Sequence, residues 1–149
     1  MNNIGVGIGI LIFNSNKEIL LLLRNSDAKK ADSNMRLEGT YTLPSGNINY
    51  NESFEDAAIR KTKEESNLDI KKEDLNLISI SDDKNEYAHY VTIGMIANKY
   101  SGEVMLKDSE EFVSYDWFDI DNLPSNLCEP SRKIIKNYLN NRIYNKEEI

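Results

Sequence analysis

Apolar residues gather in two stretches at the start of the chain, and both stretches predict strands. Residues 4–13 contain only apolar residues and glycine, which is the pattern of a strand buried on both faces. Residues 18–24 form a second, largely apolar run that ends at Arg24. The four residues between them, Asn-Ser-Asn-Lys, have the composition of a turn. We therefore predict that the two strands pair as a hairpin.

Glycine and polar residues mark two further features of this region. Gly5, Gly7 and Gly9 allow a ligand or another backbone to approach the first strand closely, and no helix follows them as a dinucleotide-binding fingerprint would require. Residues 25–39 are polar and have no clear period. Because a loop of this length in a compact domain is often functional, we expect it to form the rim of a substrate cleft.

The signals for a helix agree with one another between residues 51 and 67. Ser53 can cap the N-terminus of this helix, and Glu55 and Asp56 lie in the first turn, where the helix dipole favours anions. Asn67 tolerates the left-handed conformation in which helices commonly end.

The rest of the chain predicts further strands and a final helix, and so an α/β domain. The segments that predict strands are 41–44, 75–81, 87–97 and 112–118, with an acidic turn at 82–86. The final helix is expected from Glu129-Pro130 to about residue 141. The apolar residues that recur at helical spacing, and that we expect to pack on the sheet, are Ile134, Ile135, Tyr138 and Leu139.

The composition is that of a soluble globular protein, with 40% hydrophobic and 29% charged residues. The 149 residues fit one domain spanning 1–149. No apolar run approaches the ~20 residues of a membrane span, so we expect no membrane association and a cytoplasmic location. A single cysteine, Cys128, and a single histidine, His89, exclude a Cys/His zinc site.

The formal net charge of −7 argues against general nucleic-acid binding, which normally needs a basic surface. An acidic protein that binds a phosphorylated substrate needs local positive charge instead. The candidate cations are Arg24, Arg60 and Lys61.

Adjacent carboxylates on the predicted helix are the first candidates for chemistry. At about 100° per residue, Lys61, Glu64 and Glu65 share one side of the helix, and Arg60 lies one turn from Glu64. Two neighbouring carboxylates repel each other unless cations or a hard metal such as Mg²⁺ surround them. The alternative is a solvated helix face with ion pairs worth about 0.3 kcal/mol each.

The order of residues around this helix resembles the Nudix box. That pattern reads Gly, five residues, Glu, seven residues, then Arg-Glu-apolar-any-Glu-Glu-any-Gly-apolar. The residues that match it at the right spacing are Gly46, Glu52, Arg60, Glu64, Glu65 and Leu68. Segments outside the box, including 5–8, 18–24, 39–44, 89–93 and 115–118, are similar to the MutT-like nucleotide pyrophosphatases of this family. The resemblance implies an α/β/α sandwich around a mixed β-sheet.

The resemblance also implies a metal site. Glu64 and Glu65, with the carbonyl group of Gly46, would hold Mg²⁺, with Mn²⁺ as an alternative. Arg60 would orient a box carboxylate. A loop carboxylate ahead of residue 112, either Glu110 or Glu111, would complete the site or act as its base.

A nucleotide is the partner that the resemblance implies, and it leaves a homodimer open because members of the family often form dimers. Arg24 and Lys61 are the expected phosphate contacts. Ser45, next to Gly46, is small enough for the backbone to approach a phosphate or a metal. Thr92 is expected near the base, because the corresponding strand of nucleotide-hydrolysing relatives lies there.

Lys61 is the most consequential departure from the box, because the pattern has glutamate at that position. In the family this glutamate commonly binds metal or helps to activate water, whereas an ammonium group would neutralise part of the charge that attracts Mg²⁺. Thr62 and Asn67, which also depart from the pattern, retain a methyl group for packing and a left-handed helix stop.

Three functions follow from this combination. The first is metal-dependent hydrolysis of a nucleoside diphosphate linked to another group, foremost a nucleoside triphosphate cut to monophosphate and pyrophosphate. The second keeps this chemistry with ADP-ribose or a nucleotide sugar as the substrate. The third is a nucleotide-binding module with impaired catalysis, in which the Lys61 ammonium contacts a phosphate where a metal would otherwise lie.

Overall fold

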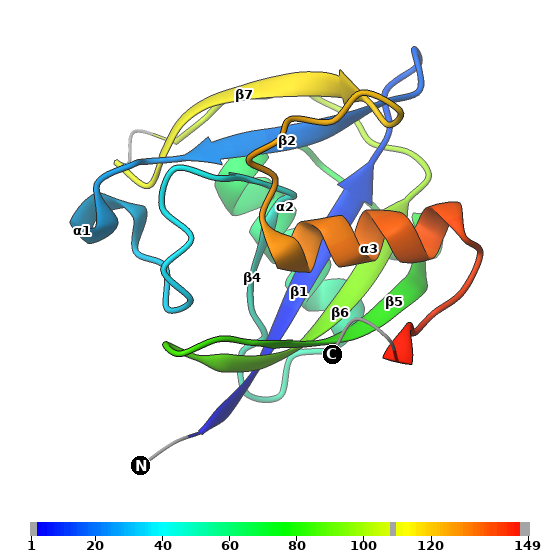
Figure 1. Cartoon of the computed structure of the whole chain (residues 1–149). Helices are drawn as coiled ribbons and strands as arrows, with labels where there is room; N and C mark the ends of the chain where they lie inside the picture. The colour runs from blue at the N-terminus through cyan, green and yellow to red at the C-terminus, as the bar shows by residue number, and fades with distance from the viewer. Residues whose placement is uncertain (1–2, 108–109, 147–149) are drawn as a thin grey trace.

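The computed structural model describes residues 3–107 and 110–146 (Figure 1). In chain order its elements are β1 (Ile4–Ile12), β2 (Glu18–Arg24), α1 (Ala28–Ala31), β3 (Tyr41–Thr42), β4 (Ser45–Asn47), α2 (Phe54–Ser66), the 3₁₀ turn η1 (Lys72–Asp74), β5 (Leu75–Lys84), β6 (His89–Ala97), β7 (Phe112–Asp119) and α3 (Glu129–Leu139). Within the described residues, no helix is both long enough and apolar enough to cross a membrane.

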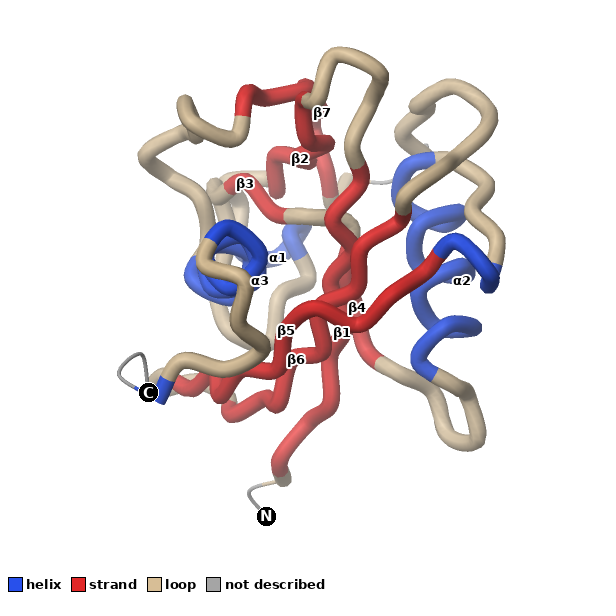
Figure 2. The backbone as a smooth tube through the Cα atoms, turned by 90° about the vertical axis from the view of Figure 1, so that its right-hand side faces the viewer, coloured by secondary structure: helices blue, strands red, loops and turns tan. Residues whose placement is uncertain are grey.

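A mixed sheet lies at the centre of the fold. Its strands follow the order β4-β1-β6-β5, with β1 parallel to β6 and the other neighbours antiparallel. Helices α2 and α3 cover opposite faces of this sheet (Figure 2). The arrangement is the α/β/α sandwich around a mixed sheet that the resemblance to the Nudix box implies.

The predicted hairpin of the first two strands is wrong. The chain forms a bridge between Phe13 and Ile19, but β2 then pairs with β3 and β7 in a separate antiparallel sheet. The reason is that both strands are apolar on both faces and need cover on each. Leu20 and Leu22 of β2 pack in the core cluster that contains α2, whereas Leu21 packs in the one that contains α3.

Helix α3 packs on the sheet through a narrower apolar face than the sequence predicts. Ile134 and Ile135 are buried, and the Tyr138 ring packs 5.6 Å from the ring of Phe13 at the end of β1, as predicted. Leu139 is 51% exposed, so its predicted packing is wrong. A polar side chain, Asn137, is buried instead and donates hydrogen bonds of 2.9 Å to Ser79 Oγ and to the carbonyl of Ile143. Burial of this amide is tolerated because both hydrogen bonds satisfy its donor group.

The predicted acidic turn at 82–86 is also wrong at its start, because β5 continues through Lys84. Asp83 is buried within the strand, where its carboxylate has a hydrogen-bond donor and a positive charge beside it. Its Oδ2 accepts a hydrogen bond from Ser81 Oγ at 2.8 Å, and Lys133 Nζ of α3 lies 3.2 Å from its Oδ1. A buried carboxylate with such partners is compatible with a strand, and the turn itself is confined to residues 85–88.

The Asp83–Lys133 pair is expected to stabilise the packing of α3 on β5. Asp83→Asn should lower the free energy of unfolding by about 2 kcal/mol, because it removes a charged hydrogen-bonding partner from a buried ammonium group. Asp82→Asn is the matched control and should leave stability unchanged, since Lys133 contacts only the main-chain carbonyl of Asp82. Urea unfolding of the two variants measures the difference, and equal stabilities would contradict this role.

Candidate active site

Helix α2 forms as predicted and supplies most of the candidate site. Ser53 Oγ accepts a hydrogen bond from the Asp56 N–H at 3.0 Å, and Asn67 ends the helix with φ of 66°. Ala57, Ala58 and Thr62 of α2 are buried toward the core. The charged residues on the other side of the helix therefore lie beside β4.

Arg60 joins two carboxylates of the box. Its Nε and Nη2 lie 2.7 and 2.8 Å from the two carboxylate oxygens of Glu52, and Nη2 also donates to the carbonyl of Asn47 at 2.8 Å. Nη1 lies 3.4 Å from both oxygens of Glu64. The hydrogen bonds from Arg60 lower the pKa of Glu52 to about 2. Arg60 therefore fixes the loop before α2 to the helix.

The Lys61 side chain lies at the centre of the site. Its Nζ is 3.2 Å from Glu64 Oε2 and 3.6 Å from Glu65 Oε2. Its stem crosses Gly46, so a methyl group on Gly46 would overlap Lys61 Cε and lie 2.9 Å from Nζ. The ammonium group thus lies between the carboxylates of Glu64 and Glu65 on one side and Gly46 of β4 on the other.

The carboxyl groups of Glu64 and Glu65 lie in different environments. Burial raises the pKa of Glu65 to about 7, although the Lys61 charge and a 2.8 Å hydrogen bond from the Ser45 N–H act in the opposite direction. Partial burial also raises the pKa of Glu64, but Lys61 and Arg60 outweigh it and hold that pKa below the usual range. Glu65 can therefore exchange a proton near neutral pH, whereas Glu64 stays ionised.

Glu111 and Arg24 approach the same region from the other side. Arg24 Nη1 lies 3.2 Å from Glu111 Oε1 and 3.1 Å from the carbonyl of Ala31, and the guanidinium group covers the Phe112 ring at 5.0 Å. The Nε atom of Arg24 is buried and has no hydrogen-bond partner among residues 3–107 and 110–146. The Glu110 side chain is 73% exposed and lies 3.9 Å from Lys30. Of the two predicted loop carboxylates, Glu111 is the one at the site.

A cavity of about 270 Å³ connects these groups. Its charged end is formed by Arg24, Lys61, Glu65 and Glu111, whose charges interact, and Tyr90 and Thr92 also line it. Predicted residues Ser45 and Gly46 also line it, whereas Glu64 lines a smaller adjoining cavity of about 170 Å³. Arg60 and Glu110 line neither of these two cavities.

Residues 3–138 match the family model for the NUDIX domain. The chain belongs to the Nudix family. It is 31% identical over 134 residues to an ADP-ribose pyrophosphatase of Methanocaldococcus jannaschii, an alignment that covers 90% of this chain and 72% of that protein. It is 30% identical to the NAD-capped RNA hydrolase NudC of Photorhabdus laumondii subsp. laumondii, covering 70% of this chain but only 38% of NudC.

The Nudix fold is also found in solved structures. A MutT NUDIX hydrolase from Burkholderia pseudomallei superposes with a TM-score of 0.78 at 24% identity, over 91% of this chain and 98% of that one. At this level of identity the likeness concerns the fold. The enzyme class follows from the family, whose hydrolases act on phosphoric anhydride bonds.

The side chains around α2 do not fit the metal site that the Nudix resemblance implies. Nudix hydrolases generally use divalent metal ions. Among residues 3–107 and 110–146, however, no cluster of three or more carboxylate, histidine or cysteine side chains could hold a metal. The space between Glu64 and Glu65 is taken by the Lys61 ammonium group. A divalent ion could bind both carboxylates only after Lys61 had moved.

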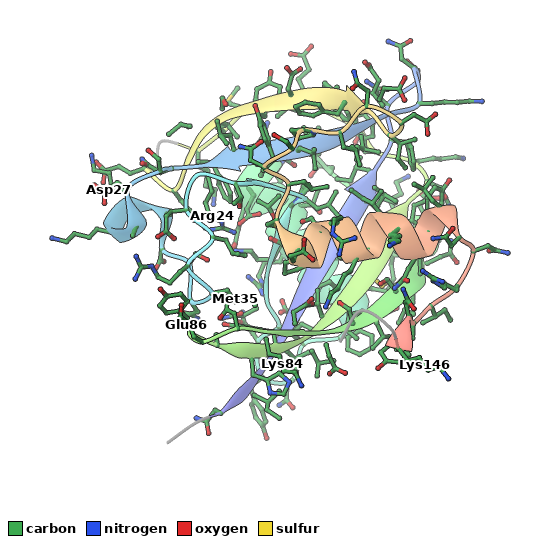
Figure 3. The ribbon with its side chains drawn as sticks, in the orientation of Figure 1. Arg24, Asp27, Met35, Lys84, Glu86 and Lys146 are labelled. Atoms are coloured by element: carbon green, nitrogen blue, oxygen red, sulfur yellow. The ribbon has the colours of Figure 1, made fainter. Side chains whose placement is uncertain are left out.

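The polar loop that the sequence predicts at the rim of a cleft does line the cavity, through residues 32–35 and 37, and Tyr90 lies beside it. Asn34 Nδ2 donates a 2.8 Å hydrogen bond to the Tyr90 hydroxyl, and Asn85 Nδ2 donates one of 2.9 Å to the carbonyl of Met35, which lies beside the β5–β6 hairpin (Figure 3). Gly7 leaves the cavity floor open in front of Tyr90. The alternating glycines of β1 were the one available signal for this floor.

Proposed function

We propose that this Nudix protein hydrolyses the phosphoric anhydride bond of a nucleoside diphosphate linked to another group. The observation that carries the proposal is the cavity in which the cations Arg24 and Lys61 face the carboxylates Glu65 and Glu111. Cations at one end suit a diphosphate, and an aromatic wall at Tyr90 suits a base or sugar.

The two cations would bind the phosphate oxygens. Both side chains line the cavity, and the Lys61 ammonium group has at least one hydrogen that Glu64 does not accept. Thr92 and Tyr90, which line the same cavity, would contact the nucleoside. The substrate would thereby be fixed with its anhydride next to the carboxylates, and this positioning is a large part of catalysis.

A carboxylate at the charged end would then accept the proton of the attacking water. The water oxygen bonds to one phosphorus atom as the bridging oxygen leaves with the other phosphate. Glu111 is the proposed base because it lines the cavity and is held by Arg24. Glu65 would position Lys61 and the Ser45 main chain, since it contacts both.

Two substrate classes remain, and their products separate them. Similarity to an ADP-ribose pyrophosphatase over 90% of the chain supports a nucleoside diphosphate linked to a sugar. A nucleoside triphosphate is the second class, and this chain shares its fold with solved MutT proteins. ADP-ribose would give AMP and ribose 5-phosphate, whereas a triphosphate cut between the α and β phosphates would release pyrophosphate. Chromatography of the products from a panel of both classes, with and without Mg²⁺ or Mn²⁺, tests the proposal.

Glu111→Gln should lower turnover of the best substrate at least tenfold, since the amide cannot accept a proton from water. Glu110→Gln is the matched control and should keep the rate of the unaltered protein, because its side chain faces solvent. Initial rates at saturating substrate measure both. Equal rates in all three proteins would contradict the role of Glu111 as the base, and no turnover of any anhydride in the panel would contradict the proposed function.

A further inference from the structure

The charges around the Lys61 side chain are nearly balanced by the protein itself. In the described part of this site, the cations are Arg24, Arg60 and Lys61, and the carboxylates are Glu52, Glu64, Glu65 and Glu111. A glutamate at position 61, as in the box, would leave only the two arginines among five carboxylates. That excess of negative charge is what attracts a divalent cation, and Lys61 largely removes it.

We propose that Lys61 takes the place of a divalent cation in holding the phosphate groups, so that the nucleotide binds without metal. This inference rests on the proposed function in one respect, namely that the ligand contains a nucleoside diphosphate.

The position of the ammonium group supports a direct contact with phosphate. Nζ donates a hydrogen bond to Glu64 Oε2 at 3.2 Å and forms an ion pair with Glu65 Oε2 at 3.6 Å, so at least one of its three hydrogens is left for a ligand. The side chain is 17% exposed and lines the cavity that Arg24 also lines. A phosphate group placed in this end of the cavity would therefore meet one cation from α2 and another from β2.

Gly46 is what allows the Lys61 side chain to lie there. A methyl group on Gly46 would overlap Cε and approach Cδ to 2.8 Å, so any larger residue must displace the end of the lysine side chain. Gly46 is not among the residues with positive φ, and alanine is therefore compatible with its backbone. Gly46→Ala thus moves the ammonium group while keeping its charge.

Titration calorimetry with ADP as the probe tests the proposal. The unaltered protein should bind ADP with the same Kd in EDTA and in Mg²⁺, within about twofold. Lys61→Met should weaken binding in EDTA at least tenfold, Gly46→Ala should weaken it severalfold, and Lys61→Arg should retain most of it. Lys63→Met is the control, because this lysine of α2 is 52% exposed and pairs with Asp69 outside the cavity.

Circular dichroism identifies any variant that fails to fold, and the expected loss of binding in Gly46→Ala keeps the test decisive if Lys61→Met is unstable. Binding of ADP that is lost in EDTA, or that is equally tight in Lys61→Met, would overturn the proposal. The outcomes also separate it from the proposed function. Metal-independent ADP binding without hydrolysis of any substrate would refute only the proposed function, whereas hydrolysis combined with strictly metal-dependent binding would refute only this inference.

Discussion

Lys61→Glu is expected to raise turnover in Mg²⁺ by about 100-fold over the natural sequence, because the new carboxylate would help a divalent ion to activate the attacking water. The substitution removes the ammonium group that lies 3.2 and 3.6 Å from the carboxylates of Glu64 and Glu65. It also adds a third carboxylate at the same place, so that a hard cation finds several oxygen ligands and can lower the pKa of a bound water.

A second readout for Lys61→Glu does not depend on activity. In EDTA the added carboxylate has like-charged neighbours, so the melting temperature should fall below that of the unaltered protein. Mg²⁺ or Mn²⁺ should restore it by binding the folded state. Lys61→Gln removes the ammonium group without adding a ligand, and it should show neither effect. If Lys61→Glu and Lys61→Gln respond alike to metal, the carboxylates around position 61 do not form a metal site.

The sequence predicts those parts of the site that depend on local structure. Ser53 and Asn67 bound α2 as their side chains and backbone preferences require, and helical spacing places Lys61, Glu64 and Glu65 on one side. Such contacts are between residues three or four positions apart and need no knowledge of the fold.

Features that depend on distant partners could not be predicted in the same way. Buried strand patterns do not specify which strand pairs with which, so the separation of β1 and β2 into different sheets was missed. Asp83 reads as a turn residue until Lys133, fifty residues later, is seen beside it. The contact of Asn34 with Tyr90 likewise joins a polar loop to a strand far along the chain.

Glu65→Gln is expected to reduce turnover by about 100-fold and, at pH 8, to make the protein more stable. Both effects follow from one buried carboxyl group, which is 6% exposed. Turnover falls because Lys61 and the Ser45 main chain lose the charge that holds them at the charged end of the cavity, and positioning of this kind carries much of a catalytic rate.

Loss of a merely structural contact would lower the stability of Glu65→Gln, whereas we expect its stability to rise at pH 8. Burial raises the pKa of Glu65 from 4.5 to about 7 in the folded protein. Its contribution to stability is therefore full below about pH 4.5 and is lost as the pH rises through 7, where ionisation costs the folded state up to about 3 kcal/mol. Glutamine cannot ionise, so the free energy of unfolding of the variant should equal that of the unaltered protein at pH 4 and exceed it at pH 8. Urea unfolding at both pH values measures this difference. Equal destabilisation at the two pH values would mean that Glu65 is ionised throughout, and its ion pair with Lys61 would then dominate over its burial.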